Sequence, residues 1–324
     1  MSSFKDVIKR GLLRTNRLQG TLEKLSIVTY QDKIRLRIPE YHSHILLDHK
    51  GQDLIGKLIA GNAPLMVSRL GSVELSCLRF FTERRQTKKT PYSKTIRSRM
   101  FENAGFFPID DKSLDAFSAL YLEKIKQADV MGVWFNPYED KICNTLCRDA
   151  ALIELMCLEP YHFTNPWSHE LAEKKVLVVH PFAESIKKQY IEKRHLLFTD
   201  PDVLPEFELQ TLQAVQSIAG THVGFASWFD AYSHMCNEMA AIDFDICIIG
   251  AGAYGLPLAS FAKSLGKQAI HMGGATQILF GIKGKRWEEL YADSTAKLFN
   301  EHWIRPFESE TPPNNLRIEG GCYW

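Results

Sequence analysis

What the sequence lacks excludes several classes of protein. It carries 39 Lys and Arg against 38 Asp and Glu in 324 residues, a formal net charge of +1, so its overall charge selects no anionic partner. Aromatic residues are not interleaved with the basic ones, as stacking on single-stranded nucleic acid requires. No run approaches the roughly 20 apolar residues of a membrane-spanning helix. The first residues also lack the apolar core of a secretory signal. We therefore expect a cytoplasmic protein with no nucleic-acid partner.

The sequence also lacks the spacing motifs of several common enzyme classes. The 7 cysteines are odd in number, and the two closest, Cys143 and Cys147, are spaced as on one helix face rather than as in a C-x-x-C metal knuckle. Neither a P-loop nor a G-x-S-x-G nucleophile elbow is present. A disulfide framework, a cysteine-rich zinc module, a P-loop NTPase and an α/β-hydrolase are therefore not supported.

What is present is an alternation of two hydrophobic patterns. The composition, 45% hydrophobic and 24% charged, is that of a folded globular protein. Short apolar runs typical of buried strands occur at residues 64–68, 129–134, 175–180, 211–218, 245–250 and 268–272. Helical periodicity occurs at residues 53–60, 73–81, 114–127, 144–156, 183–194, 228–242 and 256–265. This order predicts an α/β fold with a Rossmann-like, mostly parallel sheet and helices on both faces. No linker divides the chain, so we expect one domain over residues 51–324.

Residues 1–50 are predicted to form a basic, partly helical extension. Within residues 1–24, apolar side chains recur at helical spacing among lysines and arginines. Such a helix is either a solvated leader packed on the body or a peripheral contact with an anionic inner membrane face. A second basic stretch, residues 82–99, is a solvated loop, a lid over phosphates or a landing site for an anionic acceptor.

A glycine-rich turn follows the clearest strand. Residues 250–255 match G-x-G-x-x-G and open a helix, where small residues let backbone N–H groups approach a phosphate. A dinucleotide site also needs an acidic residue about 20 positions later, but the first one after the turn is Glu288. This favours the phosphate of another nucleotide ligand, with NAD binding or a purely structural turn as alternatives. The residues expected to bind are Gly250, Gly252, Ala253, Tyr254 and Gly255.

A second glycine turn ends the next strand. Gly273 and Gly274 close that strand, and Lys283 and Arg286 follow in a glycine-flanked stretch. Because the carboxyl ends of parallel strands share one edge of a sheet, the two turns and the two cations would form a diphosphate cradle. The alternative is a solvated basic loop.

The first and middle strands end in residues that suit catalysis. Arg69 can grip a phosphate with its planar fork, and Gly71 permits a tight turn. Glu74, in the first helical turn, could act as a base or a metal ligand, or could simply favour the helix dipole. His180 ends the middle strand and is a general base, a donor to phosphate or a structural residue.

These landmarks resemble the GT-D-type glycosyltransferases. The family's first strand is followed by Arg-Phe-Gly-Asp-X-Glu, which is similar to residues 69–74. Its middle strand after paired lysines is similar to residues 174–182, and its late strand, glycine turn, helix and second strand to residues 245–274. The resemblance implies a GT-D-type fold and a nucleotide-sugar donor. We predict Glu74, Arg69 and His180 as the catalytic group, with Gly71 and Ser72 at the diphosphate.

One departure from the family bears on the metal. The family's Asp-X-Glu, which is expected to help hold a divalent ion such as Mn²⁺ or Mg²⁺, is Ser72-Val73-Glu74 here. A hard cation prefers several oxygen ligands, and Glu74 is the one candidate that remains in this motif. Transfer without a metal, or with weak stimulation by one, is therefore the alternative.

The expected function is transfer of a sugar from a UDP- or GDP-linked donor to a glycan, lipid-linked or protein-linked, in surface polysaccharide synthesis. Two alternatives stay open: a nucleotide- or dinucleotide-dependent oxidoreductase, and a non-catalytic nucleotide-sugar-binding subunit, which the missing Asp suggests. The apolar and aromatic residues 319–324 are expected to dock on the body or on a second copy.

Overall fold

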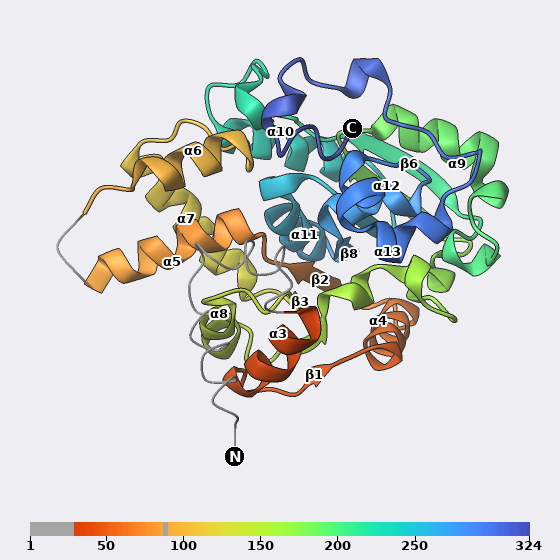
Figure 1. The fold of residues 1–324 in the computed structure, drawn as a ribbon, viewed down its shortest axis with the longest axis horizontal. Helices are drawn as coiled ribbons and strands as arrows, with labels where there is room; N and C mark the ends of the chain where they lie inside the picture. The colour runs from red at the N-terminus through yellow and green to blue at the C-terminus, as the bar shows by residue number, and fades with distance from the viewer. Residues whose placement is uncertain (1–28, 87–89) are drawn as a thin grey trace.

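The computed structural model describes residues 29–86 and 90–324 (Figure 1). Their strands form one sheet in the order β1-β4-β3-β2-β8-β7-β5-β6, and each neighbouring pair is parallel. The strands are β1 Ile45–Leu46, β2 Leu65–Arg69, β3 Val130–Val133, β4 Ala151–Glu154, β5 Lys175–His180, β6 Glu208–Gln213, β7 Ile246–Ile249 and β8 Gln268–His271. The predicted α/β fold with a parallel sheet is confirmed. The basic helix expected at residues 1–24 lies outside the described residues.

Helices cover both faces of this sheet (Figure 1). They are α3 Tyr30–Arg37, α4 His49–Ala60, α5 Ser72–Gln86, α6 Lys94–Glu102, α7 Asp111–Ile125, α8 Glu139–Leu146, α9 Ala183–Leu197, α10 Trp228–Ala240, α11 Gly255–Ser264, α12 Thr276–Leu279 and α13 Ala292–Thr295. Each of the described helices is too short or too polar to cross a membrane.

The central strands are rich in apolar residues because both of their faces are buried. In β5, Leu177 and Val179 belong to one hydrophobic cluster, which includes residues of α5, α7, α10 and α11. The alternate residues Val176 and Val178 belong to a second cluster, with residues of α4, α9 and α12. A strand whose successive side chains all meet apolar layers is typical of a parallel sheet between two helical layers.

At residues 144–156 the structure corrects the sequence-based prediction, which placed one helix there. Helix α8 ends at Leu146, and β4 follows at Ala151–Glu154. Leu152 packs into one hydrophobic cluster and Ile153 into the other, so both faces of this short run are buried. A short apolar run between two buried layers has the same composition whether it is a strand or a buried helix, which is why periodicity misassigned it.

Smaller differences concern the ends of elements. The strand predicted at residues 211–218 is β6, Glu208–Gln213, because it pairs with β5 from Lys175 to His180. The stretch at residues 82–99, expected as a loop, includes the end of α5 and the start of α6. Within residues 1–50, Ile45 and Leu46 pair with β4, so the sheet itself begins before residue 51.

The order of strands places four informative carboxyl ends together. Strands β2, β8, β7 and β5 are consecutive neighbours in the sheet. Arg69 ends β2 and His180 ends β5, while the two glycine turns follow β7 and β8. In an open parallel sheet, ligands bind beside the carboxyl ends of the strands, and we call this side the carboxyl edge.

Candidate functional site

A pocket that opens to solvent lies at the carboxyl edge of the sheet. The strand ends contribute Arg69, His180, Gly250 and Gly274 to its lining. Among the described residues that line it, Arg69 is the one Lys or Arg, and there is no Asp or Glu side chain. A pocket with this lining favours an anionic ligand over a cationic one.

Arg69 is held in place by its neighbours without being neutralised by them. Its guanidinium lies against Gly273, where an added Cβ would be 2.1 Å from Nη2, and over the ring of Trp134 at 5.2 Å. In the described part of the chain Arg69 forms no ion pair, and its Nε is buried without a hydrogen-bond partner. A fixed and unpaired guanidinium at a pocket wall is suited to a phosphate or carboxylate.

Glu74 is close enough to Arg69 to interact with its charge, and it is not part of the pocket lining. It is 8% exposed, and its Oε2 would be 1.9 Å from a Cβ added at Gly71. Gly71 is therefore required for this side chain to fold back over the turn. Burial raises the pKa of Glu74, and the nearby positive charge of Arg69 lowers it. The carboxylate and the guanidinium thus influence each other across the start of α5.

His180 is a neutral hydrogen-bond donor in this environment. Its Nδ1 accepts a hydrogen bond from the Phe182 backbone N–H at 3.0 Å, so the proton of the neutral ring is on Nε2. The side chain is 3% exposed, and this burial lowers its pKa to about 3. An imidazole with so low a pKa is a weak base near pH 7, which favours donation to a ligand over proton abstraction.

The glycine turn at residues 250–255 combines close packing with an open face. A Cβ at Gly250 would lie 2.4 Å from His180 Cδ2 and 2.8 Å from Thr276 Oγ1. Gly252 has a φ of +52°, and a Cβ there would meet nothing within 4 Å. Gly250 therefore allows three elements to meet, whereas Gly252 leaves backbone accessible at the pocket.

The other residues of this turn are held in place by packing and hydrogen bonding. The ring of Tyr254 stacks on Trp228 at 4.8 Å, and its hydroxyl is 3.1 Å from Ser217 Oγ. Ala253 is fully buried. A Cβ at Gly255 would lie 2.3 Å from His271 Nε2, so Gly255 makes room for the His271 ring and is not part of the pocket lining.

The two predicted phosphate cations are not part of the pocket lining. Lys283 Nζ lies 3.7 Å from Glu288 Oε1. Arg286 contacts Glu319 at 2.6 Å and donates to the Tyr323 hydroxyl at 3.0 Å. Gly273 is covered by the Arg69 guanidinium, and Gly274 lines the pocket. The glycine turns and Arg69 are thus brought together, while Lys283 and Arg286 face other partners.

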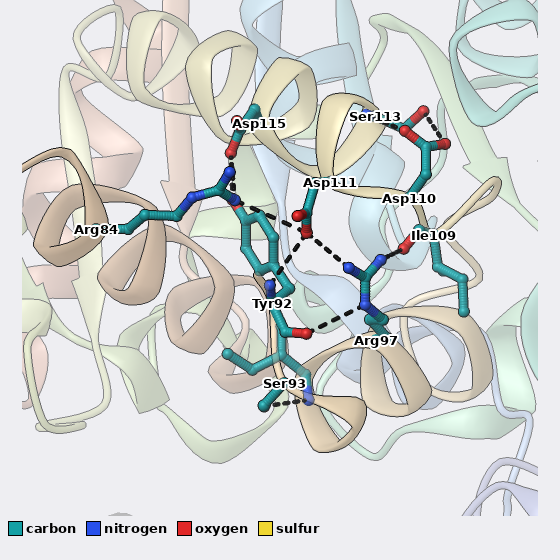
Figure 2. A network of polar contacts seen from close by, with 10 residues as sticks. Arg84, Tyr92, Ser93, Arg97, Ile109, Asp110, Asp111, Ser113 and Asp115 are labelled. Carbon is teal, nitrogen blue, oxygen red and sulfur yellow. Dashed lines mark hydrogen bonds and ion pairs between the residues drawn. The ribbon is translucent and has the colours of Figure 1, made fainter. Parts of the chain in front are cut away.

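The basic stretch at residues 82–99 has a structural function in part. Figure 2 shows Arg84 and Arg97 directed at the acidic side chains of α7. Arg97 Nη2 lies 2.6 Å from Asp111 Oδ1, and Arg84 Nη1 lies 3.3 Å from Asp115 Oδ1. These two arginines tie α5 and α6 to α7, so they are not available to an anionic acceptor.

The described residues do not fit a metal held by protein ligands alone. Within residues 29–86 and 90–324 there is no cluster of three or more His, Cys, Asp or Glu side chains that could hold an ion. Ser72 is exposed at the start of α5, and Glu74 is buried against Gly71. One inward-folded carboxylate is a poor donor set for Mn²⁺ or Mg²⁺, and we derive no step through a metal.

Sequence analysis missed three further features of this pocket. Gln277 and Tyr323 line it, and Trp134 holds Arg69 from outside it. Gln277 Oε1 and Thr276 Oγ1 are buried without a hydrogen-bond partner among the described residues. The sequence signal that could have indicated the position of Tyr323 is the pair of glycines at positions 274 and 284, because both make room for this residue.

A parallel sheet with a pocket at its carboxyl edge is the arrangement in which open α/β proteins bind their ligands. The family model described as a GT-D fold-like domain matches residues 52–279. The chain belongs to this GT-D-like family, so the resemblance found in its motifs is confirmed. This membership supports glycosyltransferase activity in general. A comparison with curated proteins finds no significant match.

Two solved structures are similar to this chain. One is described as a selenomethionine-substituted domain of unknown function 1792, with 11% identity, a TM-score of 0.45, and coverage of 86% of this chain and 96% of that one. The other is described as domain 1792 with a distinct glycosyltransferase fold, with 13% identity, a TM-score of 0.44, and coverage of 87% and 96%. At these values neither structure carries an argument about activity.

Proposed function

We propose that this protein transfers a sugar from a nucleotide-sugar donor, UDP- or GDP-linked, to a glycan acceptor that is lipid-linked or protein-linked. The observation that carries the proposal is the unpaired guanidinium of Arg69, fixed between Gly273 and Trp134 at the pocket wall. Family membership supports the reaction class, and the pocket supports an anionic donor. Synthesis of a surface polysaccharide at the inner membrane face is the setting we propose.

The chemistry needs positive charge and hydrogen-bond donors at the leaving diphosphate. When the bond between the sugar's anomeric carbon and the phosphate oxygen breaks, negative charge grows on that oxygen. Arg69 supplies a fixed cation, and His180 supplies a neutral N–H from Nε2. Because both groups are held by packing before the ligand arrives, they stabilise that charge without reorganising.

Glu74 acts on this site through Arg69 in our proposal. Its carboxylate is buried against Gly71 and shares an electrostatic interaction with the guanidinium. It keeps the guanidinium oriented toward the pocket while leaving it without a direct ion pair. A direct role for Glu74 as acceptor base or metal ligand, expected from the sequence, stays a prediction.

Calorimetric titration with UDP and GDP tests this function in two variants. Arg69→Gln removes the pocket cation, and Arg79→Gln removes an arginine of α5 that pairs with Glu83 at 2.9 Å and does not line the pocket. Hydrogen bonds to charged groups are worth about 1.5–3 kcal/mol, so Arg69→Gln should weaken binding of the nucleotide by about tenfold or more. Arg79→Gln should bind like the wild type. If the wild type binds neither nucleotide, or Arg69→Gln binds as tightly as the wild type, the proposal is wrong.

A further inference from the structure

Residues 319–324 lie beside the pocket, although they are distant in sequence from the strand ends that form it. Tyr323 and Trp324 both line it, beside the turn that carries Gly274. Figure 1 shows this end of the chain beside α12, and Gln277 of α12 donates from Nε2 to the Tyr323 carbonyl at 3.1 Å. The segment therefore forms one side of the pocket, and the strand ends and their loops form the rest.

Several hydrogen bonds hold this segment in place. The backbone N–H of Arg286 donates to the Cys322 carbonyl at 2.8 Å, and that of Lys285 donates to the Trp324 carbonyl at 3.3 Å. The guanidinium of Arg286 also stacks over the Tyr323 ring at 4.5 Å. The stretch around Arg286, which the sequence suggested for phosphate, thus serves as the anchor of this segment.

Two glycines make the close approach possible. A Cβ at Gly274 would lie 2.7 Å from Tyr323 Cε1, and one at Gly284 would lie 2.5 Å from the Tyr323 carbonyl oxygen. The Arg69 guanidinium lies on Gly273, the residue directly before Gly274. Consecutive Cα atoms are about 3.8 Å apart, so the cation of the pocket and the ring of Tyr323 rest on adjacent residues.

We propose that Tyr323, with Trp324 beside it, is the platform on which the base of the donor nucleotide stacks. This inference rests on the proposed function, because Arg69 must hold the diphosphate for the base to reach the ring. Arg286 covers one face of the Tyr323 ring, and Tyr323 is half-buried and lines the pocket. Trp324 packs on Phe182 at 6.1 Å, which extends the aromatic wall. Stacking on an aromatic ring stabilises a bound base whatever the hydrogen-bonding pattern of that base.

The experiment compares a ligand that has a base with one that lacks it. UDP, GDP and inorganic pyrophosphate are titrated into the wild type, Tyr323→Leu and Tyr323→Phe. Tyr323→Leu should weaken nucleotide binding by about tenfold or more and leave pyrophosphate binding unchanged, because the stacking surface is lost while Arg69 keeps its place. Tyr323→Phe keeps the ring and should bind both ligands nearly as the wild type does. Leu316→Ala, at a side chain that is 74% exposed, is the control for changes near the segment.

The outcomes separate this inference from the function on which it rests. If the wild type binds nucleotide and Arg69→Gln weakens it, but Tyr323→Leu binds nucleotide normally, the base platform is wrong and the proposed function stands. Equal loss of nucleotide and pyrophosphate in Tyr323→Leu also overturns the platform. If the wild type binds no nucleotide, both fall. Saturation-transfer NMR on the wild type gives a second measurement: the base protons should receive more saturation than the ribose protons, and the reverse would contradict the platform.

Discussion

The guanidinium of Arg69 occupies the space where a side chain at position 273 would begin. Gly273 has a φ of +70°, and a Cβ there would be 2.1 Å from Arg69 Nη2. The strand β2 supplies the cation, and the turn after β8 supplies the gap that receives it. The two residues are far apart in the sequence and come together because β2 pairs with β8.

Replacing Gly273 by alanine should displace Arg69. We expect Gly273→Ala to lose about 1 kcal/mol or more of stability, since an L-residue is strained at this φ. It should also weaken UDP or GDP binding by about tenfold or more, because the cation moves. The matched control is Gly266→Ala, whose φ is +79° and whose Cβ would meet nothing within 4 Å. Equal nucleotide affinities in the two variants, measured by calorimetry, would contradict the role of this contact.

Glu74→Gln should separate binding from turnover. The amide keeps the shape of the side chain against Gly71 but removes the charge that Arg69 feels. We expect the variant to fold, to bind nucleotide within a few-fold of the wild type and to lose nearly all sugar transfer, because the orientation that Glu74 gives Arg69 matters most when charge grows on the leaving phosphate. Donor-consumption assays alongside thermal unfolding measure both. Unchanged turnover in a folded variant would remove Glu74 from the mechanism.

His180 should not titrate between pH 6 and 8. Burial lowers its pKa to about 3, so the ring is neutral throughout that range. We expect nucleotide affinity to depend on pH in the same way in the wild type and in His180→Gln. The variant should still bind more weakly, because the Nε2 donor is lost or displaced. An inflection near pH 6.5 that disappears in His180→Gln would show that the histidine is protonated and that its environment is wrongly described.

The buried carboxyl of Glu139 should make the fold less stable as the pH rises. Burial raises its pKa from 4.5 to about 7, despite hydrogen bonds from the Trp134 and Asn136 backbone N–H groups. A folded-state pKa above the unfolded value means that the native state binds more protons at this site, so the contribution of Glu139 to stability is greatest below about pH 4.5 and is lost as the pH rises toward 7. Urea unfolding at pH 5, 6 and 7 should show this slope in the wild type and a flatter one in Glu139→Gln. Identical slopes would contradict the assignment.

Arg286→Met should loosen residues 319–324. The change removes the contacts with Glu319 and the Tyr323 hydroxyl, and we expect a loss of about 2 kcal/mol in thermal or urea unfolding. Arg305→Met is the control, since Arg305 forms a partly exposed ion pair with Glu288 and should cost about 1 kcal/mol or less. A loss no larger than that of the control would show that Arg286 does not anchor the segment.

The residues of the site that could be predicted from sequence are those at the carboxyl ends of strands. Arg69, His180 and Gly250 each follow a short apolar run, and parallel strands place such residues at one edge of the sheet whatever the loops do. The helix predicted at residues 144–156 was wrong, because β4 carries no pattern that distinguishes a doubly buried strand from a buried helix.

The contacts that sequence could not supply are those between side chains distant in the chain. Nothing local to Arg286 indicates that its partners are Glu319 and Tyr323 rather than a ligand. Gly274 was predicted to bind phosphate, because a phosphate and the Tyr323 ring both need the same missing Cβ to approach closely. The position of Trp134 over Arg69 likewise depends on β3 lying beside β2.

A crystal structure with UDP or GDP bound tests the central claim most directly. The account predicts the diphosphate within hydrogen-bond distance of the Arg69 guanidinium and beside the backbone of residues 250–252. A diphosphate bound elsewhere on the protein, with Arg69 still unliganded between Trp134 and Gly273, would contradict it.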